Sequence, residues 1–131
     1  MFKVQELLKA TRGKLIRGKL DSSVRGVSTD TRILKHGEVF IAIKGRNFDG
    51  HSFIEQAIRK GSPAVIFQKP FSRISPKGKA AFIEVKDTVV ALGDLARFHR
   101  QRFDTPVIAV TGSCGKTTTK EMIRNKASAY R

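Results

Sequence analysis

One stretch of the sequence has the residue types of a phosphate-binding loop. Residues 105–121 read TPVIAVTGSCGKTTTKE, a β-branched run followed by a glycine turn, a lysine and three threonines. Gly112 and Gly115 allow a tight turn whose backbone N–H groups point into one concavity, and a following helix adds the positive end of its dipole. Lys116 would reach the β- and γ-phosphates of ATP, and the Thr117 hydroxyl would ligate Mg²⁺. The predicted ATP-phosphate site comprises Thr111, Gly112, Ser113, Cys114, Gly115, Lys116, Thr117 and Thr118.

This loop departs from the common pattern G-x-x-x-x-G-K-[ST] at one position, because Val110 stands where the first glycine belongs. One alternative is that Gly112 and Gly115 only allow a tight turn and bind no ligand. Another is that Cys114 is a nucleophile, since helix N-termini lower the pKa of a thiol. No histidine lies near Cys114 in the sequence. We therefore interpret it as a residue that fills the loop.

Two upstream segments carry polar groups suited to a nucleotide diphosphate. The first supplies hydroxyls, backbone N–H groups and a forked guanidinium that matches phosphate oxygens. In the second, the sequence DGH directly precedes an amphipathic stretch, so that N–H groups at a helix start would face a ligand. The first segment comprises Ser28, Thr29, Asp30, Thr31 and Arg32, and the second Lys44, Asn47, Asp49, Gly50 and His51.

Each segment also has an alternative interpretation without a ligand. Asp30 would cap its own backbone in a polar turn that leaves Arg32 as a solvated charge. Asp49 would be an ordinary helix N-cap, with His51 an exposed residue of the first turn. The residues alone favour this alternative for the first segment, and for the second it is the commoner fate of such a pair.

The chain has a formal net charge of +15 from 26 Lys and Arg against 11 Asp and Glu. Such a surface attracts polyanions in general, including RNA, DNA and phosphorylated small molecules. The basic residues are spread from Lys3 to Arg131, and no aromatic-rich RNP strand, zinc finger or basic recognition helix accompanies them. We therefore expect no specific nucleic-acid partner, although a basic nucleic-acid-binding protein remains an alternative.

Length and composition indicate a soluble globular protein. The 131 residues are 40% hydrophobic and 28% charged, which fits one ordinary domain but not a second complete one. No apolar run approaches the roughly 20 residues that cross a bilayer, and the N-terminus lacks the apolar core of a secretion signal. A single cysteine agrees with a reducing compartment. We expect a cytoplasmic protein without a membrane partner.

The elements that position these motifs alternate between helix and strand. Helical spacing predicts a helix with Val4, Leu7 and Leu8 inside, ending near Gly13. Strands are predicted at the start of 24–32, in 38–45, in 63–68 and in 80–85, with a basic connector over 69–79. Two further helices are predicted: 51–60, with Phe53, Ile54, Ala57 and Ile58 on one stripe, and 88–101, capped by Asp87, with Val89, Leu92, Leu95 and Ala96 inside.

This alternation predicts an α/β fold with a small parallel or mixed sheet. Residues 103–106, FDTP, form a hinge-like break, after which VIAV at 107–110 is predicted to begin a new strand–loop–helix unit. We therefore expect a domain over 1–103 and the start of another over 104–131.

Taken together, the motifs resemble the Mur ligase family. TGSCGKTTTKE at 111–121 is similar to its phosphate loop T-G-[ST]-N-G-K-T-[TS], and the trailing TTKE to the branch that adds D-alanyl-D-alanine, commonly called MurF. The upstream motifs agree in content and order: GVSTDTR at 26–32, GEVFIAIKG at 37–45, FDGHSFIEQAIRKG at 48–61 and PAVIF at 63–67. The resemblance extends to about Ile123, and Cys114 departs from it where the family usually has asparagine.

The resemblance implies an ATP-dependent ligase of peptidoglycan synthesis that joins D-alanyl-D-alanine to UDP-N-acetylmuramoyl-tripeptide. It implies that residues 1–103 bind the UDP part of that substrate, with the S-x-D-[ST]-R match at 28–32 near the diphosphate, and that 104–131 begin a central domain for ATP and Mg²⁺. The family's carbamylated lysine, Mg²⁺ ligands and dipeptide domain have no counterpart here, so we expect a truncated, catalytically incomplete chain. A non-catalytic nucleotide-binding module is the alternative.

The apolar strand predicted at 107–110 would have no neighbours from its own domain. Its backbone groups and apolar side chains would then be uncovered, which makes an aggregation-prone edge. We therefore expect it to dock on residues 1–103 or to pair between chains, which would give a homo-oligomer.

Overall fold

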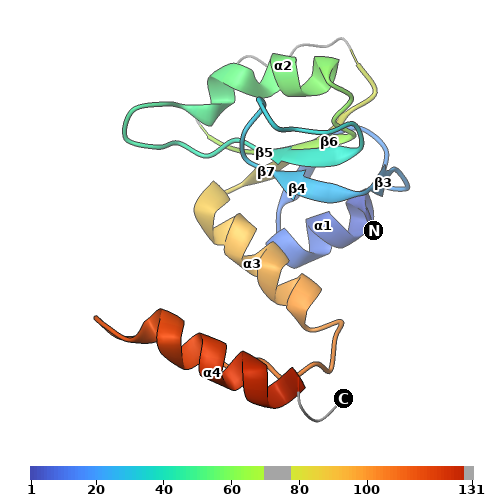
Figure 1. Cartoon of the computed structure of the whole chain (residues 1–131). Helices are drawn as coiled ribbons and strands as arrows, with labels where there is room; N and C mark the ends of the chain where they lie inside the picture. Colours follow the sequence, from blue (N-terminus) through green and yellow to red (C-terminus); the bar gives the residue numbers. More distant parts are fainter. Residues whose placement is uncertain (70–77, 129–131) are drawn as a thin grey trace.

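The computed structural model describes residues 1–69 and 78–128. A five-stranded mixed sheet lies at the centre of the fold, in the order β2-β7-β6-β5-β4 (Figure 1). Four neighbouring strands are parallel, and β2 pairs antiparallel with β7 at one edge. The strands are β2 (Lys14–Arg17), β4 (Gly26–Ser28), β5 (Glu38–Ile41), β6 (Ala64–Gln68) and β7 (Ala81–Val85), and a separate antiparallel pair joins β1 (Phe2–Lys3) to β3 (Ser23–Val24).

Helices cover both faces of the sheet. On one face lie α1 (Val4–Thr11) and α3 (Thr88–Arg100), which pack against each other, and on the other lies α2 (Ile54–Arg59), preceded by the 3₁₀ turn η1 (Gly50–Phe53) (Figure 1). Of these, η1 and α2 form the crossover from β5 to the parallel strand β6, which a short hairpin could not make because it joins only antiparallel neighbours. The prediction of an α/β fold with a mixed sheet is confirmed.

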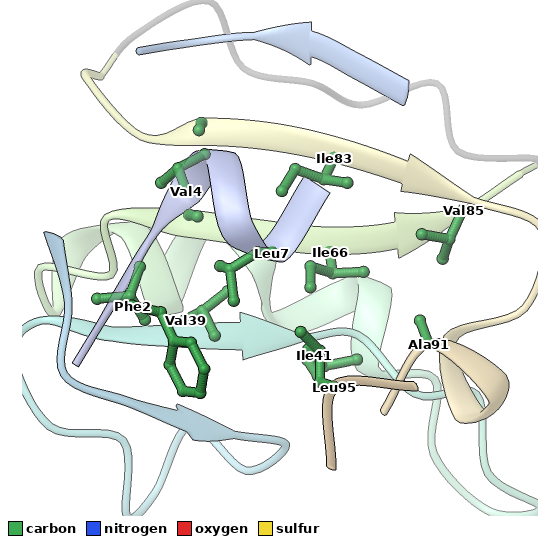
Figure 2. Close-up of a cluster of buried hydrophobic side chains, with 13 residues drawn as sticks. Phe2, Val4, Leu7, Val39, Ile41, Ile66, Ile83, Val85, Ala91 and Leu95 are labelled. Atoms are coloured by element: carbon green, nitrogen blue, oxygen red, sulfur yellow. The ribbon is translucent and has the colours of Figure 1, made fainter. Parts of the chain in front are cut away.

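Alternate residues of each strand supply the two cores. In β5, Val39 and Ile41 belong to the cluster under α1 and α3, whereas Phe40 belongs to the cluster under α2. This division follows from the two-residue period of a strand, whose successive side chains point to opposite faces. Figure 2 shows the first cluster, in which Leu7 of α1 and Leu95 of α3 lie among the side chains of the sheet.

The helices confirm most of the sequence predictions, but two inward positions predicted for α3 are wrong. Asp87 caps α3, because its Oδ1 accepts from the backbone N–H groups of Val89 (2.7 Å) and Val90 (3.0 Å). The predicted inward residues Val89 and Ala96 are exposed, Val89 by 58%. The buried stripe instead contains Ala91 and Leu95 with Thr88, because Thr88 is held at the sheet by Gln68 and thereby sets the rotation of the helix.

Two strands were not predicted. The sequence predicted no element over the residues of β2, and β1 is only two residues long. Both depend on pairing with distant partners, β7 and β3, which local sequence does not reveal. Of the expected basic connector over 69–79, residues 70–77 lie outside the described residues.

The strand predicted at 107–110 is wrong for this structure. Residues 103–112 form neither helix nor strand, and Val107 and Ile108 are each 67% exposed. A strand needs a ladder partner, and no described strand pairs with this segment. The expectation that it docks on residues 1–103 is likewise wrong, and pairing between chains stays a prediction. Beyond it, α4 (Lys116–Ser128) lies apart from the sheet (Figure 1).

Candidate functional site

The two polar segments meet at one edge of the sheet. β4 and β5 are neighbouring parallel strands, so the segments that follow them leave the sheet at the same end. Ligands of open α/β sheets commonly bind outside the carboxyl ends of the strands. A cavity of about 530 Å³ lies there, and its described wall consists of Thr29, Asp30, Thr31, Arg32, Phe40, Ile43, Phe48, Gly50, Phe53 and Gln56.

The first segment forms a tight polar turn. The Ser28 hydroxyl donates to the carbonyl of Asp30 (3.0 Å) and accepts from the N–H of Asp30 (3.3 Å). The Asp30 carboxylate accepts from the N–H of Arg32 (2.8 Å), which is the self-capping geometry of an Asx turn. This local bonding matches the alternative interpretation for Asp30, yet the same turn presents residues 29–32 to the cavity.

Arg32 is exposed and paired with Asp30. Its side chain is 86% exposed, its Nε donates to both carboxylate oxygens of Asp30 at 3.0 Å, and its Nη2 lies 2.6 Å from Oδ2. Hydrogen bonding from Arg32 lowers the pKa of Asp30 to about 2, and the same pair raises the pKa of Arg32. Nη1 takes no part in these bonds, so the guanidinium keeps donors for an anion while Asp30 orients it.

Two residues of α2 and its C-terminus hold this turn, and sequence reasoning missed both. The Thr31 hydroxyl donates to Oε1 of Gln56 (2.9 Å). The Lys60 ammonium donates to the carbonyl of Thr31 (2.5 Å) and lies 3.4 Å from that of Arg32. Both belong to the stretch FIEQAIRKG, but only its apolar stripe was interpreted. The sequence feature that could have indicated Gln56 and Lys60 is that both are polar residues next to that apolar stripe.

The second segment is a hairpin-like loop closed by backbone bonds. Lys44 and Asp49 form an antiparallel bridge, and the N–H of Gly45 donates to the carbonyl of Phe48 (2.8 Å). The N–H of Gly50 donates to the carbonyl of Ile43 (2.8 Å), and Gly50 is the member of this segment that lines the cavity. The predicted site residues Lys44 and Asn47 are exposed and lie outside the cavity's described wall.

His51 is buried, being only 8% exposed, which corrects the idea of an exposed first-turn residue. Its Nδ1 lies 2.6 Å from Oδ1 of Asp49, and its Nε2 accepts from the backbone N–H of Gln68 (3.1 Å). Asp49 caps the 3₁₀ turn by accepting from the N–H of His51 (3.0 Å), and this bond is the main cause of its lowered pKa. Ser28, Asp49 and His51 thus support the cavity and lie outside its described wall.

Aromatic side chains form the apolar part of the cavity and were not predicted as site residues. Phe40 is buried, whereas Phe48 is 75% exposed and Phe53 is partly exposed. Phe53 was predicted on the inward stripe of its helix, but it lies in the 3₁₀ turn before α2 and lines the cavity instead. The sequence feature that could have indicated them is that Phe48 and Phe53 lie on either side of DGH. Aromatic faces stack on nucleobases, and such stacking tolerates any base.

The phosphate-loop segment has the predicted turn and helix without the preceding strand. Gly112 and Gly115 have φ values of 147° and 74°, and α4 begins at Lys116. Residues 111–118 are all exposed, including the free thiol of Cys114. Its glycines, its lysine and the N-terminus of its helix are the features that a phosphate-binding loop needs. Among the described residues, no cluster of three or more His, Cys, Asp and Glu side chains could hold a metal.

Comparisons with known proteins agree with this arrangement. Residues 23–100 match the family described as Mur ligase family, catalytic domain. The chain is 46% identical over 110 residues to a UDP-N-acetylmuramoyl-tripeptide–D-alanyl-D-alanine ligase of Synechocystis, covering 84% of this chain and 24% of that protein. The chain therefore belongs to the Mur ligase family.

Solved structures support the same relationship. The structure of a UDP-N-acetylmuramoylalanyl-D-glutamyl-2,6-diaminopimelate–D-alanyl-D-alanyl ligase from Acinetobacter baumannii aligns with a TM-score of 0.82 at 34% identity, covering 98% of this chain and 28% of that one. The MurF ligase of Thermotoga maritima in complex with ADP aligns with a TM-score of 0.66 at 38% identity, covering 78% and 23%. The chain thus spans about a quarter of the length of the relatives it matches. None of the helices in the described ranges is long and apolar enough to cross a membrane.

Proposed function

We propose that residues 1–103 bind the uridine diphosphate end of a UDP-N-acetylmuramoyl peptide in the cavity at the ends of β4 and β5. The observation that carries this proposal is that two separate polar segments, 29–32 and the loop ending at Gly50, line one cavity with an aromatic wall. Its volume of about 530 Å³ lies within the roughly 300–1,000 Å³ typical of ligand pockets. A pyrimidine nucleotide offers both a stacking face and phosphate oxygens.

Each part of the cavity has a role in this proposal. Phe48 and Phe53 provide faces for the uracil ring. Arg32, oriented by Asp30, donates charge-assisted hydrogen bonds to the diphosphate, and the hydroxyl of Thr29 adds a polar contact. The Thr31 hydroxyl instead donates to Gln56 and holds the turn. Lys60 fixes the carbonyl side of the turn, so that these groups remain together.

We further propose that the chain is the N-terminal part of an ATP-dependent ligase that adds D-alanyl-D-alanine to UDP-N-acetylmuramoyl-tripeptide in peptidoglycan synthesis. The relatives with that name at up to 46% identity support it. ATP, when bound, would supply the phosphoryl group that activates a substrate carboxylate. In this proposal residues 111–118 hold its phosphates, Thr117 contributes to the Mg²⁺ site, and residues 1–131 alone do not complete the reaction.

Calorimetric titration tests the binding proposal. The chain is titrated with UDP-N-acetylmuramoyl-tripeptide, ATP and a short RNA, each at two salt concentrations. We expect the UDP compound to bind in preference to the others. Binding of ATP or UDP without preference for the muramoyl compound would instead favour a non-catalytic nucleotide-binding module, and steeply salt-dependent RNA binding alone would favour a nucleic-acid-binding protein.

Two matched variants locate the site. Arg32→Ala removes charge-assisted bonds worth about 1.5–3 kcal/mol, which corresponds to binding weaker by roughly 10- to 100-fold. Arg17→Ala removes the same charge from β2, at the opposite edge of the sheet, and should leave the affinity unchanged. Equal losses in the two variants would show that the charge of the chain, and not this cavity, attracts the ligand.

A further inference from the structure

A line of hydrogen bonds connects the cavity loop to the interior of the sheet. It begins at Asp49, passes through the buried His51 ring to the backbone of Gln68 at the end of β6, and continues to α3. There, Oε1 of Gln68 accepts from the N–H (3.0 Å) and the hydroxyl (3.1 Å) of Thr88, which is fully buried. No described buried side-chain nitrogen or oxygen lacks a hydrogen-bond partner.

The partners of the His51 ring determine its tautomer. A backbone N–H can only donate, so Nε2 must accept from Gln68 and carry no proton. The ring proton therefore lies on Nδ1 and points to Oδ1 of Asp49, 2.6 Å away. A protonated imidazole would place an N–H group against the N–H of Gln68, which removes this bond. The geometry requires neutral histidine with its proton on Nδ1.

We propose that His51 is a positioning residue for ligand binding, which ties the loop of residues 44–50 to the end of β6 and so fixes Phe48 and Gly50 at the cavity wall. The proposal rests on the proposed uridine diphosphate site. It assigns His51 a role without ligand contact, because the ring lies outside the cavity's described wall and both its nitrogens have internal partners.

Among the described residues, few other hydrogen bonds connect the loop to the rest of the fold, so this tie matters for its position. The backbone bonds at Gly45 and Gly50 close the loop and join its end to Ile43, in the segment that enters it. The bond from His51 to Gln68 instead reaches a different strand, 17 residues further along the chain. Large aromatic side chains bind well only where they are held in place before the ligand arrives, since ordering them on binding weakens affinity.

Three variants separate positioning from general stability. His51→Phe keeps a flat ring of similar size without nitrogen atoms, whereas His51→Gln retains an acceptor that reaches the Nε2 position. Thr88→Val is the matched control, because it removes a buried hydrogen bond at the far end of the same line without touching the loop. For each variant, the dissociation constant for uridine diphosphate, the amide exchange rates of Gly50 and Gln68, and the melting temperature are measured.

We expect His51→Phe to speed the exchange of both amides and to weaken binding of uridine diphosphate by at least tenfold. His51→Gln should restore the dissociation constant to within about threefold of the wild-type value, and Thr88→Val should lower the melting temperature only. In the wild-type chain, two-bond ¹H–¹⁵N correlation spectra should show the proton of His51 on Nδ1.

The proposal is overturned if the proton lies on Nε2, if His51→Phe binds as tightly as the wild type, or if His51→Gln is as weak as His51→Phe. A loss of affinity in Thr88→Val equal to that in His51→Phe would also overturn it. If the wild type does not bind uridine diphosphate, the proposed function fails, while the tautomer and exchange rates still decide the positioning. Should His51→Phe not fold, Asp49→Ala must show the faster exchange at Gly50, and its absence contradicts the proposal.

Discussion

The substitution Gly50→Ala gives the sharpest test of how the cavity loop is built. A Cβ atom at this position would lie 2.7 Å from both the backbone N and O of Ile43 and 3.0 Å from the carbonyl carbon of Ala42. These neighbours are backbone atoms, so no side-chain rotation relieves the contact. The loop or residues 42–43, which follow β5, must shift, and the 2.8 Å bond from the Gly50 N–H to Ile43 is strained with it.

The expected cost follows from this overpacking. Inserting a methyl group into a closely packed site costs about 1–3 kcal/mol. For a domain of this size each kcal/mol lowers the melting temperature by roughly 4–8 °C, so we expect a decrease of at least about 4 °C in a calorimetric scan. Affinity for uridine diphosphate should fall with it, since Gly50 lines the cavity.

Gly45→Ala is the matched control within the same loop. Among the described atoms, a Cβ there would meet only the carbonyl oxygen of Phe48, at an ordinary 3.4 Å. We expect its melting temperature and its affinity to remain within error of the wild type. If Gly50→Ala behaves like Gly45→Ala, the close approach of Gly50 to Ala42 and Ile43 does not constrain the cavity, and the reasoning is refuted.

Three further predictions concern other parts of the chain. The Asp30 carboxyl should titrate near pH 2 by NMR, and its pKa should return toward 3.8 in Arg32→Ala. Because the folded-state pKa is lowered, the pair's contribution to stability is present above pH 3.8 and is lost as the pH falls through about 2. An unchanged titration in the variant would contradict the pairing. Gly93→Ala should stabilise α3 by about 0.5–1 kcal/mol in urea unfolding, because a Cβ there meets no atom of the described ranges within 4 Å; a destabilised variant would contradict this. Limited proteolysis should cut first within 103–115, which is exposed and has no strand, whereas resistance of this segment would indicate docking.

The sequence predicted the sheet well where strands are buried on both faces. Runs such as AVIF and AFIEV show continuous apolar character, and they became β6 and β7. It failed at β2, a short basic edge strand that exists only through its pairing with β7. It also predicted a strand at 107–110 that does not form, because these strand-forming residues pair with none of the described strands. Pairing is a tertiary property, so local composition decided neither case.

The candidate site was predictable in its location but not in the roles of its residues. Both polar segments follow parallel strands, which brings their ends together. The burial of His51 could not be read from DGH, because it depends on the N–H of Gln68, on a distant strand. The support that Lys60 gives to the turn at Thr31 depends in the same way on packing across 29 residues.

The central claim is that the cavity at the ends of β4 and β5 binds a uridine diphosphate group. Its most direct test is a ¹H–¹⁵N NMR titration of the chain with uridine diphosphate, followed to saturation. The account predicts that the largest saturable shifts fall on residues 29–32 and 48–53. Saturating uridine diphosphate that leaves both segments unshifted, or that shifts only residues elsewhere, would contradict it.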